Sequence, residues 1–181
     1  MVFSDLRIGV ISDTHDHLPY TKRAIQQLLD REIELLIHLG DFTSPFTVRL
    51  IHELIKSRVN RVFAVLGNND GDVLSLSKLF NQYGWYLNPS PTIIEIDSKR
   101  FYLMHGNGPA DFTERVARSA FEKLDVDVVL YGHTHIAKYE KCGNRIILNP
   151  GEVCGYITGK SSIAILDTKD QSVEFIELTT I

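Results

Sequence analysis

The sequence lacks long apolar runs, runs of basic residues and closely spaced cysteine pairs. No apolar stretch approaches the length of about 20 residues that a membrane-spanning helix needs, so a membrane protein is not expected. A net charge of −4 without a basic run argues against a nucleic-acid groove and against a surface for anionic membranes. The two cysteines, Cys142 and Cys154, lack CxxC spacing, and a chain of 181 residues is too long to need a disulfide scaffold.

Two sequence motifs are also missing. The chain has no G-x-x-x-x-G-K-[ST] segment, which excludes the P-loop nucleotide hydrolases. The first residues, MVFSDLRIGVISD, carry an acid and a base where a secretory signal needs an apolar core, so no signal peptide is expected. These absences together predict a cytoplasmic location.

The composition that remains is that of an ordinary globular protein, with 44% hydrophobic and 23% charged residues. A chain of this length can bury a substantial core without staples. It contains no internal repeat, no low-complexity tract and no linker. We therefore expect one domain that comprises residues 1–181.

Apolar strands alternate with amphipathic segments along the first part of the chain. The periodicity predicts helices over residues 19–31, 45–57, 72–83 and 109–123. Buried strands are predicted over 7–12, 34–40, 61–67 and 127–132, and a hairpin over 92–97 and 100–106. Residues 137–142, 145–151, 161–167 and 172–178 are predicted to form a meander of strands. This pattern indicates a mixed α/β sandwich, with sheets packed together and helices outside.

Polar side chains follow five of the buried strands, in each case where the strand ends. The residues are Asp13 and His15, Asp41, Asn68 to Asp70, His105, and the pair His133 and His135. In open α/β sheets, ligands bind beyond the carboxyl ends of the strands, so these side chains are expected at one rim. If the chain stays extended after Gly132, the last two histidines lie on the same side of it.

The residue types at this rim predict a metal centre. Carboxylates, imidazoles and an amide, without a thiolate, suit divalent ions such as Mn²⁺, Fe²⁺, Ni²⁺ or Zn²⁺. Seven candidate ligands are too many for one tetrahedral ion but suit two, and a carboxylate such as Asp41 can bridge ions roughly 3.5–4 Å apart. Such a pair lowers the pKa of a bound water, supplies hydroxide near neutral pH and withdraws charge from a phosphorus centre.

The order and spacing of D-x-H (13–15), G-D (40–41), G-N-x-D (67–70), H-G (105–106) and G-H-T-H (132–135) resemble the calcineurin-like metallophosphoesterase superfamily. The segments SDTHDHLP, GNND and NPGEVCGYITG are similar to small single-domain phosphodiesterases of archaea and bacteria. The resemblance implies a four-layer αββα sandwich of two mixed sheets flanked by helices. It implies one ion held by Asp13, His15, Asp41 and His135, and a second held by Asp41, Asn68, His105 and His133. The implied activity is hydrolysis of a small phosphodiester by metal-bound hydroxide, with Mn²⁺ as the expected ion.

One position departs from the family pattern. Many members have histidine directly after the ligand asparagine, whereas this chain has Asn69. An amide can donate a hydrogen bond but has no proton to transfer near neutral pH. Either no general acid operates and Asn69 positions the phosphoryl group, or His17, four residues after Asp13, supplies the proton.

Four other residues are expected to lie near the metal centre or to support it. We interpret Asp70 as a partner that orients a ligand histidine, with a turn residue as the alternative. His38, inside an apolar strand, is expected to be a satisfied core residue or to support the site. Asn149 and Gly151, in the long Pro/Gly segment NPGEVCGY, are expected to border it.

A second class of function is a non-catalytic metal-binding scaffold in a protein complex, because one eukaryotic relative of this fold is a subunit of a membrane-coat complex. In that relative the ligand set is partly eroded. Here all seven positions hold competent ligands, which favours the enzyme. Assembly into a homo-oligomer is left open.

Overall fold

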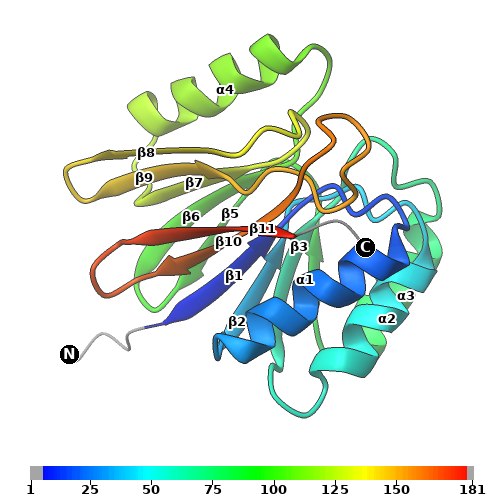
Figure 1. The fold of residues 1–181 in the computed structure, drawn as a ribbon. Coiled ribbons are helices and arrows are strands. Elements are labelled where there is room, and N and C mark those ends of the chain that lie inside the picture. Colours follow the sequence, from blue (N-terminus) through cyan, green and yellow to red (C-terminus); the bar gives the residue numbers. More distant parts are fainter. Residues whose placement is uncertain (1–5, 179–181) are drawn as a thin grey trace.

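Residues 6–178 are described by the structure, a computed structural model (Figure 1). Six strands form a mixed sheet in the order β11-β10-β1-β2-β3-β4. They are β1 (Arg7–Ile11), β2 (Leu35–His38), β3 (Arg61–Val65), β4 (Tyr86–Asn88), β10 (Ser161–Asp167) and β11 (Val173–Leu178). The strands β1 to β4 run parallel to one another, while β10 pairs antiparallel with both β1 and β11.

Five strands form the second sheet, in the order β5-β6-β7-β9-β8. They are β5 (Thr92–Ile96), β6 (Lys99–Met104), β7 (Val128–Tyr131), β8 (Lys138–Cys142) and β9 (Arg145–Asn149). The strands β6, β7 and β9 are parallel, and the edge strands β5 and β8 are antiparallel to their neighbours. Both sheets are therefore mixed.

The described chain has four helices, and each buries one face. They are α1 (Leu18–Asp30), α2 (Pro45–Ile55), α3 (Val73–Tyr83) and α4 (Ala110–Lys123). On α1, Ala24, Ile25 and Leu28 are buried, which is the i, i+1, i+4 pattern of a helix face packed on a sheet. The side chains of Ser44 and Asp72 accept backbone N–H groups at the starts of α2 and α3 and so cap these helices.

Three clusters of buried apolar residues separate four layers. The first joins α1, α2 and α3 to the outer face of the six-stranded sheet, and includes Ile25, Ile51 and Leu76. The second lies between the sheets, and the third joins α4 to the other face of the five-stranded sheet. The layers can be followed in Figure 1, with α4 on one side and α1, α2 and α3 on the other. The predicted αββα sandwich is confirmed.

Two details of the predicted topology are wrong. The short strand β4 was not expected, because its three residues, Tyr86–Asn88, are too few to show a period-two pattern. The predicted meander is instead two hairpins in different sheets, since β9 pairs with β7 and β8, whereas β10 pairs with β1 and β11. Residues 150–160 carry the chain from one sheet to the other.

This topology places the candidate site. The parallel strands β1, β2 and β3 end at the same edge of their sheet, and β6 and β7 end at the adjoining edge of the other. The two rims are linked directly, since the backbone N–H of His133, after β7, donates to the carboxylate of Asp13, after β1. None of the helices within residues 6–178 is long and apolar enough to cross a lipid bilayer.

Candidate metal centre

The loops after β1, β2 and β7 turn sharply at the predicted ligand residues. Five of these residues have φ angles between 43° and 67°, in the left-handed region: Asp13, His15, Asp41, His133 and His135. Asp and His adopt this conformation more readily than most residues, yet it is uncommon outside glycine. Left-handed residues concentrated at one rim indicate a functional site whose backbone is held by the surrounding structure.

The turns separate the two histidines that follow β7. Because His133 and His135 have positive φ, the chain does not stay extended after Gly132, so the condition under which both would lie on one side is not met. The ring of His135 stacks on His15 with centroids 5.5 Å apart. The ring of His133 lies edge-on to His105 at 5.1 Å. The four imidazoles therefore form two pairs.

Asp13 lies at the base of the cluster and is completely buried. Its Oδ2 accepts hydrogen bonds from the Ser12 hydroxyl at 2.5 Å and from the His133 backbone N–H at 3.1 Å. Its Oδ1 has no hydrogen-bond partner and lies 3.5 Å from His135 Nε2 and 3.8 Å from His15 Nε2. Burial raises the pKa of Asp13, and nearby histidines oppose this rise. A buried, unpaired carboxylate oxygen beside two ring nitrogens fits a cation.

In three histidines, one ring nitrogen donates a hydrogen bond to another group of the protein. The other nitrogen then keeps its lone pair, which a metal ion could accept. Nδ1 of His105 donates to the Leu39 carbonyl at 2.7 Å, and Nδ1 of His135 donates to Glu152 at 2.8 Å. Nε2 of His133 donates to the Gly108 carbonyl at 2.7 Å, which leaves Nδ1 of that ring with the lone pair. Metal-ligating histidines in proteins are typically oriented in this way.

The second group of ligand atoms meets at His105. Its Nε2 lies 3.1 Å from Asn68 Oδ1, 3.3 Å from Asp41 Oδ2 and 4.0 Å from Asp13 Oδ1. All three oxygens are acceptors, so Nε2 of His105 must either carry a proton or share a cation with them. Burial lowers the pKa of His105, but its hydrogen bond to Asp41 and the charges of Asp13 and Asp41 outweigh this effect and raise it.

Asp41 lies between the two groups. Its Oδ2 is 3.4 Å from His15 Nε2 and 3.3 Å from His105 Nε2. Burial would raise the pKa of Asp41, but hydrogen bonds from His105 and Asn69 outweigh it and hold the pKa well below the usual range. The residue is therefore an ionised carboxylate in contact with ligand atoms of both groups.

The donor set suits divalent ions of hard to borderline character. Oxygen and imidazole nitrogen atoms are its members, and ligand atoms of Asp13, His15 and Asp41 all lie within 4.8 Å of one another. Cys154 Sγ also lies close to His15 and His135. Its thiol donates to Glu152 at 3.0 Å, and burial together with this carboxylate raises the pKa of Cys154 strongly. A thiol held in protonated form is a poor ligand.

A model of the calcineurin-like phosphoesterase superfamily domain matches residues 6–171. The chain belongs to this superfamily. It is 36% identical to phosphodiesterase MJ0936 of Methanocaldococcus jannaschii, over 96% of this chain and 99% of the relative. It is 25% identical to phosphodiesterase YfcE of Escherichia coli, over 82% of this chain and 79% of the relative.

Two solved structures have the same fold. An archaeal phosphodiesterase, 36% identical, superposes with a TM-score of 0.84 over 96% of this chain and all of that one. Vps29 of Chaetomium thermophilum, 19% identical, superposes with a TM-score of 0.65 over 96% of this chain and 97% of that one. The second likeness concerns the fold alone.

Two glycines of the superfamily motifs allow the loops to approach each other. A Cβ atom on Gly67 would lie 2.2 Å from Asp41 Oδ1, and one on Gly132 would lie 2.2 Å from Ser12 Oγ. Both contacts are far shorter than van der Waals distance. Any side chain at either position would displace the carboxylate of Asp41 or the hydroxyl that holds Asp13.

Sequence reasoning missed Glu152, which lies in the NPGEVCGY segment. It is completely buried, and it accepts hydrogen bonds from His135, Cys154, Ile157 and Thr158. The carboxylate thus orients His135, a candidate ligand, and also closes the loop of residues 152–158. A lone acid among glycine and apolar residues was the signal that could have identified it. Asn149, expected to border the site, is buried and donates to Gly132 and Thr134 in the loop that carries the two histidines.

The structure places Asp70 and His38 beneath the rim. Asp70 accepts backbone N–H groups of Asp41, Gly67 and Thr43 at 2.7–3.1 Å. It therefore holds the loop of Asp41, and the prediction that it orients a histidine is wrong. His38 is buried, bonded to Thr14 and Gly40 and stacked on a phenylalanine, so it is a satisfied core residue.

Asn69 and His17 lie at different parts of the rim. Asn69 donates from its backbone and from Nδ2 to the two oxygens of Asp41, each at 2.8 Å. His17 caps α1, because its Nδ1 accepts the Tyr20 N–H at 3.2 Å. Tyr156 lies between the two histidines of that loop, with ring centroids 5.4 Å from His17 and 6.5 Å from His15.

Proposed function

We propose that this chain is a phosphodiesterase that binds two divalent ions and hydrolyses a small phosphodiester. The observation that carries the proposal is the buried, unpaired Oδ1 of Asp13, towards which Nε2 atoms of His15, His105 and His135 converge. The names of the relatives support the same activity, since MJ0936 and YfcE are both phosphodiesterases.

The geometry supports the division of ligands into two overlapping groups. Asp13, His15, Asp41 and His135 would hold one ion, and Asp41, Asn68, His105 and His133 the other. When bound, such ions lower the pKa of water and neutralise charge on a phosphoryl group. Asp41 is the residue common to both groups, since its Oδ2 lies within 3.4 Å of ring nitrogens in each.

The protein's own residues fix these ligands before any substrate arrives. Asn69 donates to both oxygens of Asp41 and therefore limits rotation of that carboxylate. Glu152 and the Leu39 carbonyl fix the orientations of His135 and His105. Nδ2 of Asn69 has a second hydrogen, so it could donate to a phosphoryl oxygen and keep its hydrogen bond to Asp41.

Manganese is the ion we propose, because oxygen and imidazole ligands without thiolate suit it. The cytoplasmic location stays a prediction.

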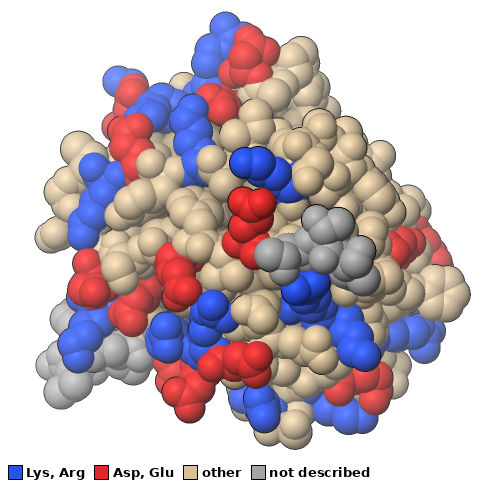
Figure 2. Space-filling model, in the orientation of Figure 1, with Lys and Arg blue, Asp and Glu red and all other residues tan. Residues whose placement is uncertain are grey.

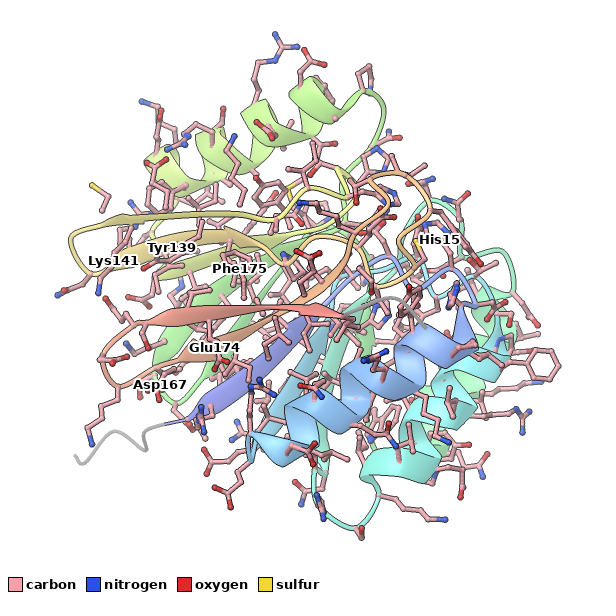
Figure 3. All side chains as sticks on the ribbon, viewed as in Figure 1. His15, Tyr139, Lys141, Asp167, Glu174 and Phe175 are labelled. Atoms are coloured by element: carbon pink, nitrogen blue, oxygen red, sulfur yellow. The ribbon has the colours of Figure 1, made fainter. Side chains whose placement is uncertain are left out.

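The test is turnover of bis(p-nitrophenyl) phosphate by protein loaded with Mn²⁺. Release of p-nitrophenolate that is abolished by a chelator and restored by Mn²⁺ supports the proposal. Asp13→Asn should lose turnover, whereas Glu174→Gln on β11, remote from the cluster and labelled in Figure 3, should keep it. Binding of Mn²⁺ without turnover of any phosphodiester would favour the scaffold alternative instead.

A further inference from the structure

A hollow of about 420 Å³ adjoins the metal cluster on the side of His135. It lies where the edge strands β8 and β11 of the two sheets come close together (Figure 1). Nearby, β8 is joined to the turn between β10 and β11, since Tyr139 donates to the Gln171 carbonyl and Lys141 donates to the Asp170 carbonyl. The hollow is therefore bounded by both sheets.

The register of β11 shows that the hollow continues the core between the sheets. Side chains alternate along a strand, so Val173, Phe175 and Glu177 share one face of β11. Val173 packs against the core between the sheets, whereas Phe175 and Glu177 line the hollow. The core between the sheets is thus uncovered beside β11. Phe175 is the last apolar side chain on this face of β11, because the next residue on the face is Glu177.

The walls of the hollow are mostly apolar. Phe175 is 40% exposed and Ile136 is 53% exposed, and Ala137 lies beside them. Figure 3 labels Phe175 in the gap between the two edge strands, and Figure 2 shows a largely uncharged area over this gap with charged side chains around it. An uncovered aromatic ring on the core-facing side of a sheet offers a surface for a flat apolar group.

The polar groups of the wall are arranged around this surface. The hydroxyls of Thr158 and Ser162 donate away from the hollow, to Glu152 and to the Pro150 carbonyl. Lys160 and Glu177 add one cationic and one anionic side chain. The two charges offset each other, so the hollow as a whole selects for shape and apolar surface rather than for net charge.

We propose that this hollow is the subsite for an aromatic ester group of the substrate, with its ring packed against Phe175. The inference rests on the proposed function, which places the phosphoryl group at the adjoining cluster that includes His135. The volume falls within the range of about 300–1,000 Å³ that is usual for small-molecule sites. The substrate class is thereby narrowed to diesters with a flat aromatic group of about nucleoside size.

Binding of two phosphonates tests the subsite without any turnover, because a C–P bond is not hydrolysed. Phenylphosphonate and methylphosphonate are each titrated by calorimetry into protein loaded with Mn²⁺. Burial of the phenyl ring should make phenylphosphonate bind roughly 10- to 100-fold more tightly than methylphosphonate. Inorganic phosphate serves as a control for the cluster itself.

Variants assign the preference to Phe175. Phe175→Ala should reduce the phenyl-to-methyl ratio about three- to tenfold, and Phe175→Tyr, which keeps the ring, should retain it. With bis(p-nitrophenyl) phosphate, Phe175→Ala should raise KM by a similar factor and leave kcat nearly unchanged, since the ring binds substrate and transition state alike. Ile136→Ala, at an exposed loop position, truncates a second side chain of the same wall. It should also lower the phenyl-to-methyl ratio and raise KM.

The matched control is Tyr86→Ala, which removes an exposed aromatic from β4 at the opposite edge of the six-stranded sheet. It should leave KM and the phosphonate ratio unchanged. Equal affinities for the two phosphonates, or a ratio that Phe175→Ala and Ile136→Ala do not alter, would overturn the subsite while turnover by the wild type upholds the proposed function. Absence of turnover in the wild type would reject that function, and the phosphonate ratio would then decide on the subsite alone.

Discussion

Glu152→Gln tests whether a buried carboxylate orients the ligand His135. The substitution keeps the shape of the side chain but replaces one acceptor oxygen with an NH₂ group, which can only donate. Every partner of Glu152 is itself a donor: His135 Nδ1, the Cys154 thiol, and the N–H or O–H groups of Ile157 and Thr158. Glutamine therefore cannot satisfy them all.

The pKa of Glu152 gives the magnitude. Burial alone would raise this pKa, but the hydrogen bonds from His135, Cys154 and Thr158 outweigh burial and lower it from 4.5 to about 2. The difference corresponds to roughly 3 kcal/mol of stabilisation at neutral pH. Because the pKa is depressed on folding, the contribution is present above pH 4.5 and is lost as the pH falls towards 2. Protonated Glu152 presents nearly the same groups as glutamine, so the two proteins should converge in acid.

The assay is urea unfolding of metal-free wild type and Glu152→Gln at several pH values between 7 and 3.5. The free energy of unfolding should differ by up to about 3 kcal/mol at pH 7, and the difference should shrink below pH 4.5. The affinity for Mn²⁺ at pH 7 should fall about 10- to 100-fold, as for other carboxylates that orient a ligand histidine.

Glu174→Gln is the control, since Glu174 is half exposed and pairs with Arg31 on the surface. It should change stability by less than about 1 kcal/mol and leave metal affinity unaltered. The reasoning is refuted if Glu152→Gln binds Mn²⁺ as tightly as the wild type, or if its loss of stability is the same at pH 3.5 as at pH 7.

Three further predictions concern the metal centre. The protein should bind two Mn²⁺ ions per chain in elemental analysis or calorimetry; saturation at one ion would rule out the shared role of Asp41. Asp41→Ala should reduce turnover of bis(p-nitrophenyl) phosphate by more than about 100-fold, because it disturbs both ligand groups, and activity above roughly a tenth of wild type would contradict this. If no general acid operates, wild type and His17→Ala should show the same steep dependence of rate on leaving-group pKa, and Asn69→His should make it shallower. A shallow wild-type dependence that steepens in His17→Ala would identify His17 as the acid.

The rim of the site could be located from the sequence because the ends of buried strands can be recognised in it. An apolar run that stops at a polar residue or glycine marks the end of a buried strand, and parallel strands bring their ends to one edge. This was sufficient to place Asp13, Asp41 and His105 in one cluster. It could not give the conformation after the strand, and the left-handed turns at His133 and His135 exclude the extended path under which both would lie on one side.

Contacts across long sequence separations were beyond the same reasoning. Asp70 was expected to orient a histidine, but three backbone N–H groups donate to it instead. Every residue except proline has a backbone N–H, so the sequence does not reveal which of them will donate to a given carboxylate. Glu152 approaches His135 only because residues 150–160 cross from β9 to β10. A meander of four strands, as the turn signals suggested, would have placed that segment elsewhere.

The strained turns explain how the cluster can be preorganised. Left-handed conformations at five ligand residues each cost on the order of 1 kcal/mol or more, so other contacts must hold them. The ladder of β1 and β2 supplies these contacts beyond the ends of the strands, since Asp13 N–H donates to Gly40 and His15 N–H donates to Asp41. On the other side, Cys154 N–H donates to the Asp13 carbonyl. Asp13 is thus tied to two neighbouring loops through its backbone, while its buried Oδ1 accepts no hydrogen bond from the described residues and is free to contact a cation.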